Sequence, residues 1–165
     1  MKLYQLQSKL NLPIGVQEAW DFLSNPKNLK LITPPEMGFV IKSGADRPMY
    51  AGQLIQYSVS PLPGFTTKWV SEITHVQEPE YFVDVQVFGP YALWHHKHFI
   101  KPIEGGVEME DIVDYKLPFG ILGQLAHPIL VKKKLLEIFE YREKKLIEIF
   151  GAFNEEPKVI NMQSI

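Results

Sequence analysis

The sequence contains no cysteine. This absence excludes a disulfide-stabilised scaffold, catalysis by a thiol, and zinc or iron–sulfur sites with cysteine ligands. A large excess of charge of either sign is also missing, because the formal net charge is −2. Nothing in this balance indicates the basic surface that is typical of proteins that bind nucleic acid. We therefore expect no nucleic-acid partner.

Long hydrophobic runs are missing as well. No apolar stretch approaches the roughly 18 residues that a membrane-spanning helix needs. Residues 1–13 (MKLYQLQSKLNLP) lack the long apolar run behind basic residues that marks a signal peptide. We therefore expect a cytoplasmic protein without stable membrane insertion, and its oligomeric state is open between a monomer and a homodimer.

The composition is that of one ordinary globular domain, since 45% of the 165 residues are hydrophobic and 22% are charged. A chain of this size buries roughly 70% of the surface of its unfolded form, which is enough for a core and an internal pocket. We expect a single domain over residues 1–151. Residues 152–165 show no periodic pattern, so a loosely ordered tail is expected there.

Periodic patterns along the chain predict an α+β fold. Residues 3–12 alternate between apolar and polar positions, as a half-buried strand does. A short helix is expected over 16–23, and a second one from the Asn25-Pro26 cap to about residue 32. Six further strand-like segments follow between 38 and 115, separated by breaks rich in Gly, Pro, Ser, Asp or Glu.

A long helix is expected from Pro128 to about Phe150, with Gly151 placed to end it. One half-buried strand and six successive strands favour a curved antiparallel sheet of seven strands. The sheet must bury one of its faces, and the long helix is the element large enough to cover it. A strongly bent sheet does not close tightly on one helix everywhere, so we expect a cavity between them.

Three of the five histidines lie in the segment ALWHHKHFI, residues 92–100. If this strand pairs with the next one through a two-residue turn in KPIEGGV, one face of the pair carries His96 and His98 beside Asp111. The opposite face then carries His95 with three acids and two lysines, which indicates contact with water. The inward face is therefore expected to carry these site candidates: Trp94, His96, His98, Asp111 and Tyr115.

The preceding hairpin, with its turn at Glu78-Pro79, places Trp69, Asp84 and Gln86 on one face. That face is rich in aromatic residues, which favours an inward orientation. The opposite face is rich in valine and competes with it as the inward one. With the aromatic face inward, Trp69, Asp84 and Gln86 become candidates for the pocket.

Arg142 falls in the middle of the apolar stripe of the expected long helix, at about 100° per residue. A guanidinium that faces a core needs a carboxylate or several hydrogen-bond acceptors. We therefore expect Arg142 to be buried and to pair with Asp111 first and with Asp84 second.

The pair His96-x-His98 with Asp111 has the composition of a two-histidine, one-carboxylate metal site, because residues i and i+2 of a strand project to the same side. Two features count against such a site. No third histidine is aimed at the same place, and Arg142 brings a positive charge there. We therefore expect no bound metal and no cofactor.

The sequence resembles the START-like, helix-grip (SRPBCC) superfamily, which includes the birch pollen allergen fold and polyketide cyclase/dehydrase-like proteins. More narrowly, it resembles uncharacterised ligand-binding members that occur alone or fused behind an epimerase-like domain. The resemblance implies a helix-grip fold with a hydrophobic cavity. The stretches that carry it are LITPP (31–35), KWVSEI (68–73), YFVDVQVFGPYALWHHKHF (81–99), VEMEDIVDYKLPFGILG (107–123) and LLEIFEYREKKL (135–146).

Two functions remain open. The first is binding of a small hydrophobic or amphipathic molecule (lipid-, polyketide- or isoprenoid-like) in the cavity. The alternative is a cyclase-, dehydratase- or isomerase-type enzyme that uses His96, His98 and Asp111 for acid/base chemistry. The aromatic candidates either stack on the ligand or only fill the core, and His127 is expected in the loop over the cavity mouth. The ligand-binding candidates are Trp69, Asp84, Gln86, Trp94, His96, His98, Asp111, Tyr115 and Arg142.

Overall fold

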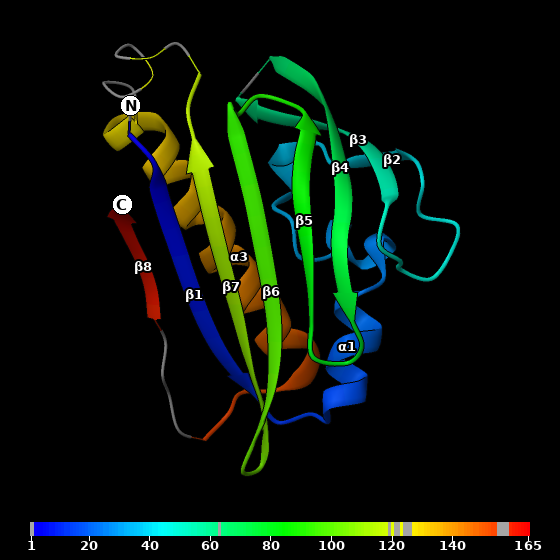
Figure 1. Cartoon of the computed structure of the whole chain (residues 1–165). Helices are drawn as coiled ribbons and strands as arrows, with labels where there is room; N and C mark the ends of the chain where they lie inside the picture. Colours follow the sequence, from blue (N-terminus) through cyan, green and yellow to red (C-terminus); the bar gives the residue numbers. More distant parts are fainter. Residues whose placement is uncertain (1, 63, 119, 121–122, 124–126, 155–158) are drawn as a thin grey trace.

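The computed structural model describes residues 2–62, 64–118, 120, 123, 127–154 and 159–165. Within these residues, eight strands form one antiparallel sheet in the order β2-β3-β4-β5-β6-β7-β1-β8. The long helix α3 lies behind the sheet in Figure 1 and runs across β1, β7 and β6. The strands are β1 (Tyr4–Leu12), β2 (Val40–Ser43), β3 (Gln53–Leu62), β4 (Phe65–Gln77), β5 (Tyr81–Phe88), β6 (Leu93–Ile103), β7 (Gly106–Lys116) and β8 (Val159–Ser164).

The helices confirm the predicted order of elements, but the type of the second short helix differs from the prediction. Asn25 caps the second short helix by accepting a hydrogen bond from the backbone N–H of Lys27 at 3.1 Å, but this helix is a 3-10 helix. The long helix ends at Gly151, which has a φ of 94°. No described helix combines the length and apolar character needed to cross a membrane. The helices are α1 (Val16–Leu23), η1 (Pro26–Lys30), η2 (Pro35–Met37), the π-helix η3 (His127–Val131) and α3 (Lys132–Phe150).

The C-terminal segment corrects two expectations, the seven-stranded sheet and the loosely ordered tail over 152–165. Residues 159–164 form β8, which pairs antiparallel with β1 and supplies the eighth strand. Its backbone satisfies the hydrogen-bonding groups that β1 would otherwise expose at the sheet edge. Ile160 and Met162 pack against the core from this strand, so their i, i+2 spacing is the signal that the sequence offered. Residues 155–158 lie outside the described part.

The hairpin of β6 and β7 has the predicted register. Ile103 lies opposite Gly106, so the turn is the two-residue Glu104-Gly105, and Gly105 adopts a φ of 80°, which suits glycine. His98 lies opposite Asp111. The inward face of this pair is therefore the one that carries the two histidines.

The hairpin of β4 and β5 follows the predicted register only in its middle. There Ser71 lies opposite Gln86 and Ile73 opposite Asp84, as a turn at Glu78-Pro79 requires. Register shifts occur between Val70 and Ser71 and between Ile73 and His75. An extra residue in one strand turns the following side chains to the other face. His75, which follows the second shift, is consequently exposed.

A layer of charged side chains divides the core between the sheet and α3. We call Asp84, His96, His98, Asp111 and Arg142 the polar layer. One apolar cluster lies on each side of it along the strands and the helix. The flanking apolar residues are Trp94 and Ile100 on β6, Met109 and Val113 on β7, and Phe139 and Leu146 on α3.

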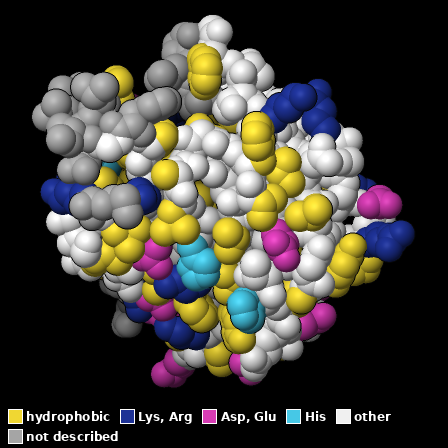
Figure 2. Space-filling view, turned by 45° about the horizontal axis from the view of Figure 1, so that its top comes forward, with side chains coloured by type: hydrophobic (Ala, Val, Ile, Leu, Met, Phe, Trp, Pro, Cys, Tyr) yellow, Lys and Arg dark blue, Asp and Glu magenta, His cyan; other side chains and the backbone are white. Residues whose placement is uncertain are grey.

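The outer face of the sheet carries a mixture of side chains. Figure 2 shows hydrophobic side chains between charged ones and histidines on this side of the molecule. Leu54, Val87 and Leu93 are among the exposed apolar residues, with relative accessibilities of 51%, 51% and 37%. The two apolar clusters are therefore on the inner face, where α3 packs.

We expect Leu146→Ala to lower the free energy of unfolding by about 2–5 kcal/mol, because Leu146 is 2% exposed in the interface of α3 with the sheet. Ile149→Ala is the matched control on the same helix, since Ile149 is 45% exposed, and a change below about 1 kcal/mol is expected. Urea unfolding measures both. Equal losses in the two variants would contradict the packing of α3 described here.

Candidate functional site

A cavity of about 470 Å³ lies between the inner face of the sheet, α3 and the segment with η1 and η2. Small-molecule sites in proteins have volumes of about 300–1,000 Å³ and mostly apolar walls. The apolar lining comes from elements far apart in the sequence. It includes Phe22, Leu29, Met37, Phe39, Ile55, Val59, Ile73, Phe82, Leu135, Ile138 and Phe139.

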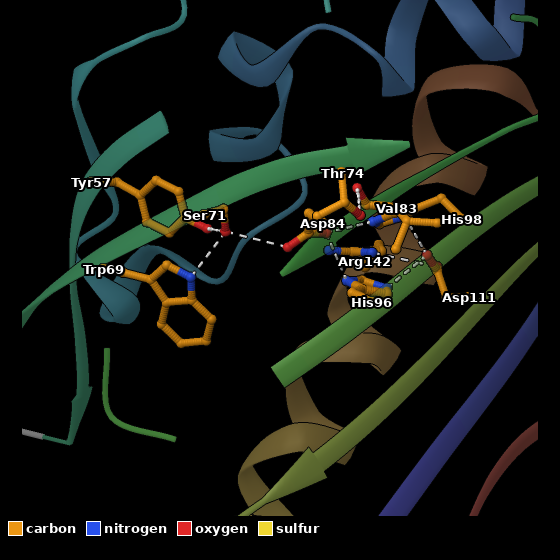
Figure 3. A network of polar contacts seen from close by, with 10 residues as sticks. All are labelled: Tyr57, Trp69, Ser71, Thr74, Val83, Asp84, His96, His98, Asp111 and Arg142. Carbon is orange, nitrogen blue, oxygen red and sulfur yellow. Dashed lines mark hydrogen bonds and ion pairs between the residues drawn. The ribbon is translucent and has the colours of Figure 1, made fainter. Parts of the chain in front are cut away.

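The polar layer forms one wall of this cavity. Figure 3 shows Asp84, His96, His98, Asp111 and Arg142 gathered where β5, β6, β7 and α3 meet. His96 and His98 project to the same side of β6 because they are two residues apart in a strand. Both are buried, with relative accessibilities of 5% and 8%. Asp84, both histidines and Arg142 line the cavity.

Asp111 holds one nitrogen of each histidine. Its Oδ1 lies 3.1 Å from His96 Nε2 and 2.7 Å from His98 Nδ1. Its Oδ2 accepts a hydrogen bond from Arg142 Nη1 at 3.4 Å. Asp111 is opposite His98 in the register of β6 and β7, so sheet pairing alone brings them together.

Asp84 faces the remaining nitrogen of each histidine. Its Oδ2 lies 3.0 Å from His98 Nε2 and 3.6 Å from His96 Nδ1. Its Oδ1 accepts a hydrogen bond from the Ser71 hydroxyl at 3.3 Å. Each histidine ring therefore lies between two carboxylates.

Ser71 connects the polar layer to two aromatic residues of the cavity wall (Figure 3). Its Oγ accepts a hydrogen bond from Trp69 Nε1 at 3.1 Å and lies 2.7 Å from the Tyr57 hydroxyl. Since the Ser71 hydrogen goes to Asp84, Tyr57 is the donor in this contact. Burial, reinforced by the charge of Asp84, raises the pKa of Tyr57, so the phenol keeps its proton.

The pKa values of the two carboxyl groups are lowered by their partners. Burial opposes this for both groups. The Arg142 charge and the histidine contacts nevertheless hold the pKa of Asp111 well below its usual range. Hydrogen bonding from His98 and the charge on both histidines lower the pKa of Asp84. Both side chains are therefore anionic near neutral pH.

The two histidines differ in their pKa values. Burial lowers the pKa of His98, but its contacts with Asp111 and Asp84 outweigh burial and raise it above 6.5. Burial and the charge of His98 lower the pKa of His96 to about 4. At pH 6.5, protonated His98 and Arg142 balance the two carboxylates, and His96 is neutral. The layer is thus close to electroneutral, which reduces the cost of burying it.

Arg142 is placed as the sequence predicts. Its side chain is 11% exposed, and it forms an ion pair with Asp111. The guanidinium also lies over the Phe139 ring, with 5.0 Å between its central carbon and the ring centroid. Its Nε is buried, and no described residue accepts a hydrogen bond from it. This donor is therefore enclosed in the interior, while the rest of the guanidinium lines the cavity.

The structure brings together most of the site residues predicted from the sequence. Trp69 and Trp94 line the cavity, and their rings meet edge to face with centroids 5.3 Å apart. Asp111 lies behind the histidines and is absent from the described lining. The predicted residues that line the cavity are Trp69, Asp84, Trp94, His96, His98 and Arg142.

Gln86 and Tyr115 are corrected, because neither lies in the described cavity lining. The Gln86 amide instead binds the backbone of Tyr91, donating to its carbonyl at 2.8 Å and accepting from its N–H at 3.2 Å. Tyr115 is fully buried, and its hydroxyl lies 2.7 Å from His127 Nε2. The backbone of Tyr91 thus occupies the Gln86 amide, which is then not available to a ligand. Tyr115 fills the core instead of lining the cavity.

His127 is also corrected, since the expectation placed it in a loop over the cavity mouth. It is buried at the start of η3 and stacks on Tyr4, with ring centroids 3.6 Å apart. Tyr57 is a site residue that the sequence analysis missed. Its signal was available, because Tyr57 lies opposite Trp69 in the register of β3 and β4.

We expect Arg142→Met to lower the free energy of unfolding by about 3 kcal/mol. Removing one partner of a buried pair costs about 3–5 kcal/mol, and the lower end applies because Asp111 keeps its histidine contacts. Arg142→Lys should lose less. Lys144→Met on the exposed side of α3 is the control, with an expected change within about 0.5 kcal/mol. Urea unfolding decides, and an Arg142→Met variant as stable as the wild type would refute the buried pair.

The lowered pKa of His96 predicts that the free energy of unfolding depends on pH. The measurement is made with a chelator present, so that only protons titrate the histidines. Between pH 6.5 and about 4, His96 gains a proton in the unfolded chain but not in the folded one. At His96 the unfolded state binds more protons, so the contribution of this group to the free energy of unfolding falls as the pH falls through this window. The carboxylates with lowered pKa values add their own loss from about pH 5 downward, in the wild type and the variants alike.

Urea midpoints measured from pH 4 to 6.5 test this dependence. His96→Gln should show a smaller slope than the wild type. His95→Gln, on the same strand but facing outward, should keep the wild-type slope. An unchanged slope in His96→Gln would show that another group titrates.

No protein-family model matches the sequence, and no curated protein matches it. Solved structures do match. A protein from Chromobacterium violaceum superposes with a TM-score of 0.67 and 14% identity, covering 90% of this chain and 99% of that one. The protein Ara h 8.0201 gives a TM-score of 0.57 and 14% identity, covering 88% and 99%.

A longer protein also contains this fold. The nucleoside-diphosphate sugar epimerase from Corynebacterium glutamicum matches with a TM-score of 0.60 and 22% identity, over 86% of this chain and 28% of that one. At sequence identities this low, the superpositions establish similarity of fold alone. With its antiparallel sheet packed on a long C-terminal helix, the chain has a helix-grip fold.

Proposed function

We propose that the protein binds a small amphipathic molecule whose apolar body fills the cavity and whose polar group reaches the polar layer. The observation that carries this proposal is the composition of the cavity, which is apolar except for one wall of buried charged side chains. Specific small-molecule sites combine apolar walls with a few placed polar groups in this way.

The apolar part of the cavity favours a hydrophobic body of moderate size. Ile55, Val59 and Ile73 are almost fully buried at the wall. Phe65 and Leu130 also line the cavity but are 54% and 51% exposed. A ligand that covered these two side chains would remove apolar surface from water, which stabilises binding by about 25 cal/mol per Å². Lipid-, polyketide- or isoprenoid-like molecules have this character.

The charged wall favours a ligand that carries an oxygen acceptor. Arg142 lines the cavity, and its side chain is 11% exposed. A carbonyl or carboxylate oxygen would accept a hydrogen bond from the exposed part of the guanidinium, whereas a purely hydrocarbon ligand would remove it from water without a partner. The polar group therefore fixes the orientation of the molecule in the cavity.

The same geometry supports a second candidate, acid/base catalysis of the cyclase, dehydratase or isomerase type. The supporting observation is His96, a neutral ring at the cavity wall whose Nε2 contacts Asp111 at 3.1 Å. A carboxylate that fixes one nitrogen of a neutral histidine leaves the other available to take a proton. His98 and Asp111 complete the set of proton donors and acceptors.

We expect protein purified from its own host to carry a bound amphipathic molecule, detectable as a mass increment by native mass spectrometry. Release and analysis of that molecule identifies it. Reloading the protein and following the ligand mass over time then separates the two candidates. An unchanged ligand supports binding alone, whereas conversion that is lost in His96→Gln supports catalysis.

Binding of the fluorescent probe 8-anilinonaphthalene-1-sulfonate, measured with a chelator present, tests the cavity directly. Ile55→Trp adds volume at the buried wall and should weaken probe binding at least about tenfold, because an overfilled cavity has less room for a ligand. Leu54→Trp is the matched control, one residue away on the exposed outer face. Equal probe affinity in the two variants would place binding outside the cavity and refute the proposal.

A further inference from the structure

Three side chains of the polar layer direct one ligand atom each toward a common point. They are Asp84, His96 and His98, whose candidate ligand atoms all lie within 4.8 Å of one another. Asp84 Oδ2 is 3.6 Å from His96 Nδ1 and 3.0 Å from His98 Nε2. All three residues line the cavity, so an ion bound between them would be accessible to a small molecule.

These spacings suit a transition-metal ion. Nitrogen and oxygen ligands lie about 2.0–2.2 Å from zinc, so ligand atoms separated by angles of about 90–110° are about 3.0–3.5 Å apart. Of the two distances from Asp84 Oδ2, 3.0 Å is at the lower end of that interval and 3.6 Å is slightly above its upper end. Two histidines and one carboxylate are a recurrent ligand set for zinc and for non-haem iron, with the remaining positions left to water or substrate.

The opposite nitrogens of both histidines are already held. His96 Nε2 and His98 Nδ1 both face Oδ1 of Asp111, at 3.1 and 2.7 Å. Histidines that ligate metals commonly donate their second N–H to a carboxylate, which fixes the tautomer and the ring orientation. A single carboxylate here orients both rings so that the other two nitrogens point at Asp84.

The carboxylate of Asp84 is supported in the same way. Its Oδ1 accepts a hydrogen bond from Ser71, which is itself held by Trp69 and Tyr57. This leaves Oδ2 directed at the histidines, as Figure 3 shows. Carboxylates that ligate metals are typically hydrogen-bonded by such neighbours.

The expectation of no metal rested on two premises that the geometry changes. The first was that no third histidine points at the site, but the carboxylate of Asp84 lies on the cavity side as a third ligand where only Asp111 had been considered. The second held that Arg142 would repel a cation. In the described part of the chain, the ion pair of Arg142 is with Asp111, so its charge offsets that of the supporting carboxylate.

We propose that Asp84, His96 and His98 bind one divalent first-row transition-metal ion of the zinc, cobalt or iron(II) class at the cavity wall. The ion takes the position of a proton on His98 Nε2, the nitrogen that faces Asp84, and that proton is released to water. With neutral histidines, the ion and Arg142 exceed the two carboxylates by one positive charge. The open coordination positions therefore favour hydroxide or an anionic oxygen. The site does not depend on the proposed apolar ligand.

Protein without an affinity tag, stripped with a chelator and then dialysed, is titrated with Zn²⁺ by calorimetry and with Co²⁺ by visible absorption. We expect one equivalent of either ion to bind. Asp84→Asn and His98→Ala should weaken binding at least about a hundredfold. Ser71→Ala, which removes the hydrogen bond to Asp84, should weaken it about 10–100-fold.

Two matched controls come from the outer face of the same hairpin. His95→Ala and Asp114→Asn remove a histidine and a carboxylate that face away from the cavity. Both variants should bind like the wild type. Absence of uptake by the wild type, or undiminished binding by His98→Ala, would overturn the proposal.

A measurement on the wild type alone covers the case in which the site variants do not fold. Co²⁺ broadens and shifts the NMR signals of nearby nuclei most, so the ring signals of His96 and His98 should change far more than those of His75 and His95. Larger changes of the His75 or His95 signals instead would refute the site. Since no organic ligand is present here and a chelator is present in the probe assay, failure of this site and failure of the proposed function are distinguishable.

Discussion

The burial of two carboxylates in the core is the constraint on which the rest of the structure depends. An ionised carboxylate that leaves water without partners costs several kcal/mol. Asp84 and Asp111 are accommodated because each receives histidine nitrogens and a further donor, from Ser71 or Arg142. These partners come from different elements, so the charged layer requires the sheet and α3 to meet in one arrangement.

The register of the sheet supplies most of this arrangement. A shift of one residue in the pairing of β6 and β7 would turn the two histidines to the outer face. The adjacent apolar positions, Trp94 and Ile100, oppose such a shift because they would then lose their place in the core. The apolar clusters on either side of the polar layer thus fix the positions of the charged groups.

The sequence was sufficient to predict the elements whose pattern is regular. Alternation in β6 and β7, together with a two-residue turn, correctly predicted the inward orientation of His96 and His98 beside Asp111. Helical periodicity correctly placed Arg142 on the buried side of α3. Both predictions depend only on the period of one element and the register of one hairpin, which are local properties of the chain.

The remaining features depend on non-local or irregular structure. The two register shifts between β4 and β5 place one extra residue in each strand, and no turn residue predicts them. β8 forms because the edge of β1 offers unpaired backbone groups, which become apparent only once the sheet is assembled. Gln86 was predicted to line the cavity, but its amide binds the backbone of Tyr91, which is only five residues away.

The position of Asp84 decides what the cavity wall can do. With Asp111 alone, the histidines would be oriented from behind and would present two free nitrogens to the cavity. Asp84 instead meets these nitrogens from β5, so they share either a proton or a metal ion with a carboxylate. The proton and the metal ion exclude each other, because both need the lone pair of His98 Nε2. The charge that a ligand encounters at this wall therefore depends on which of them is present, while the apolar part of the cavity stays the same.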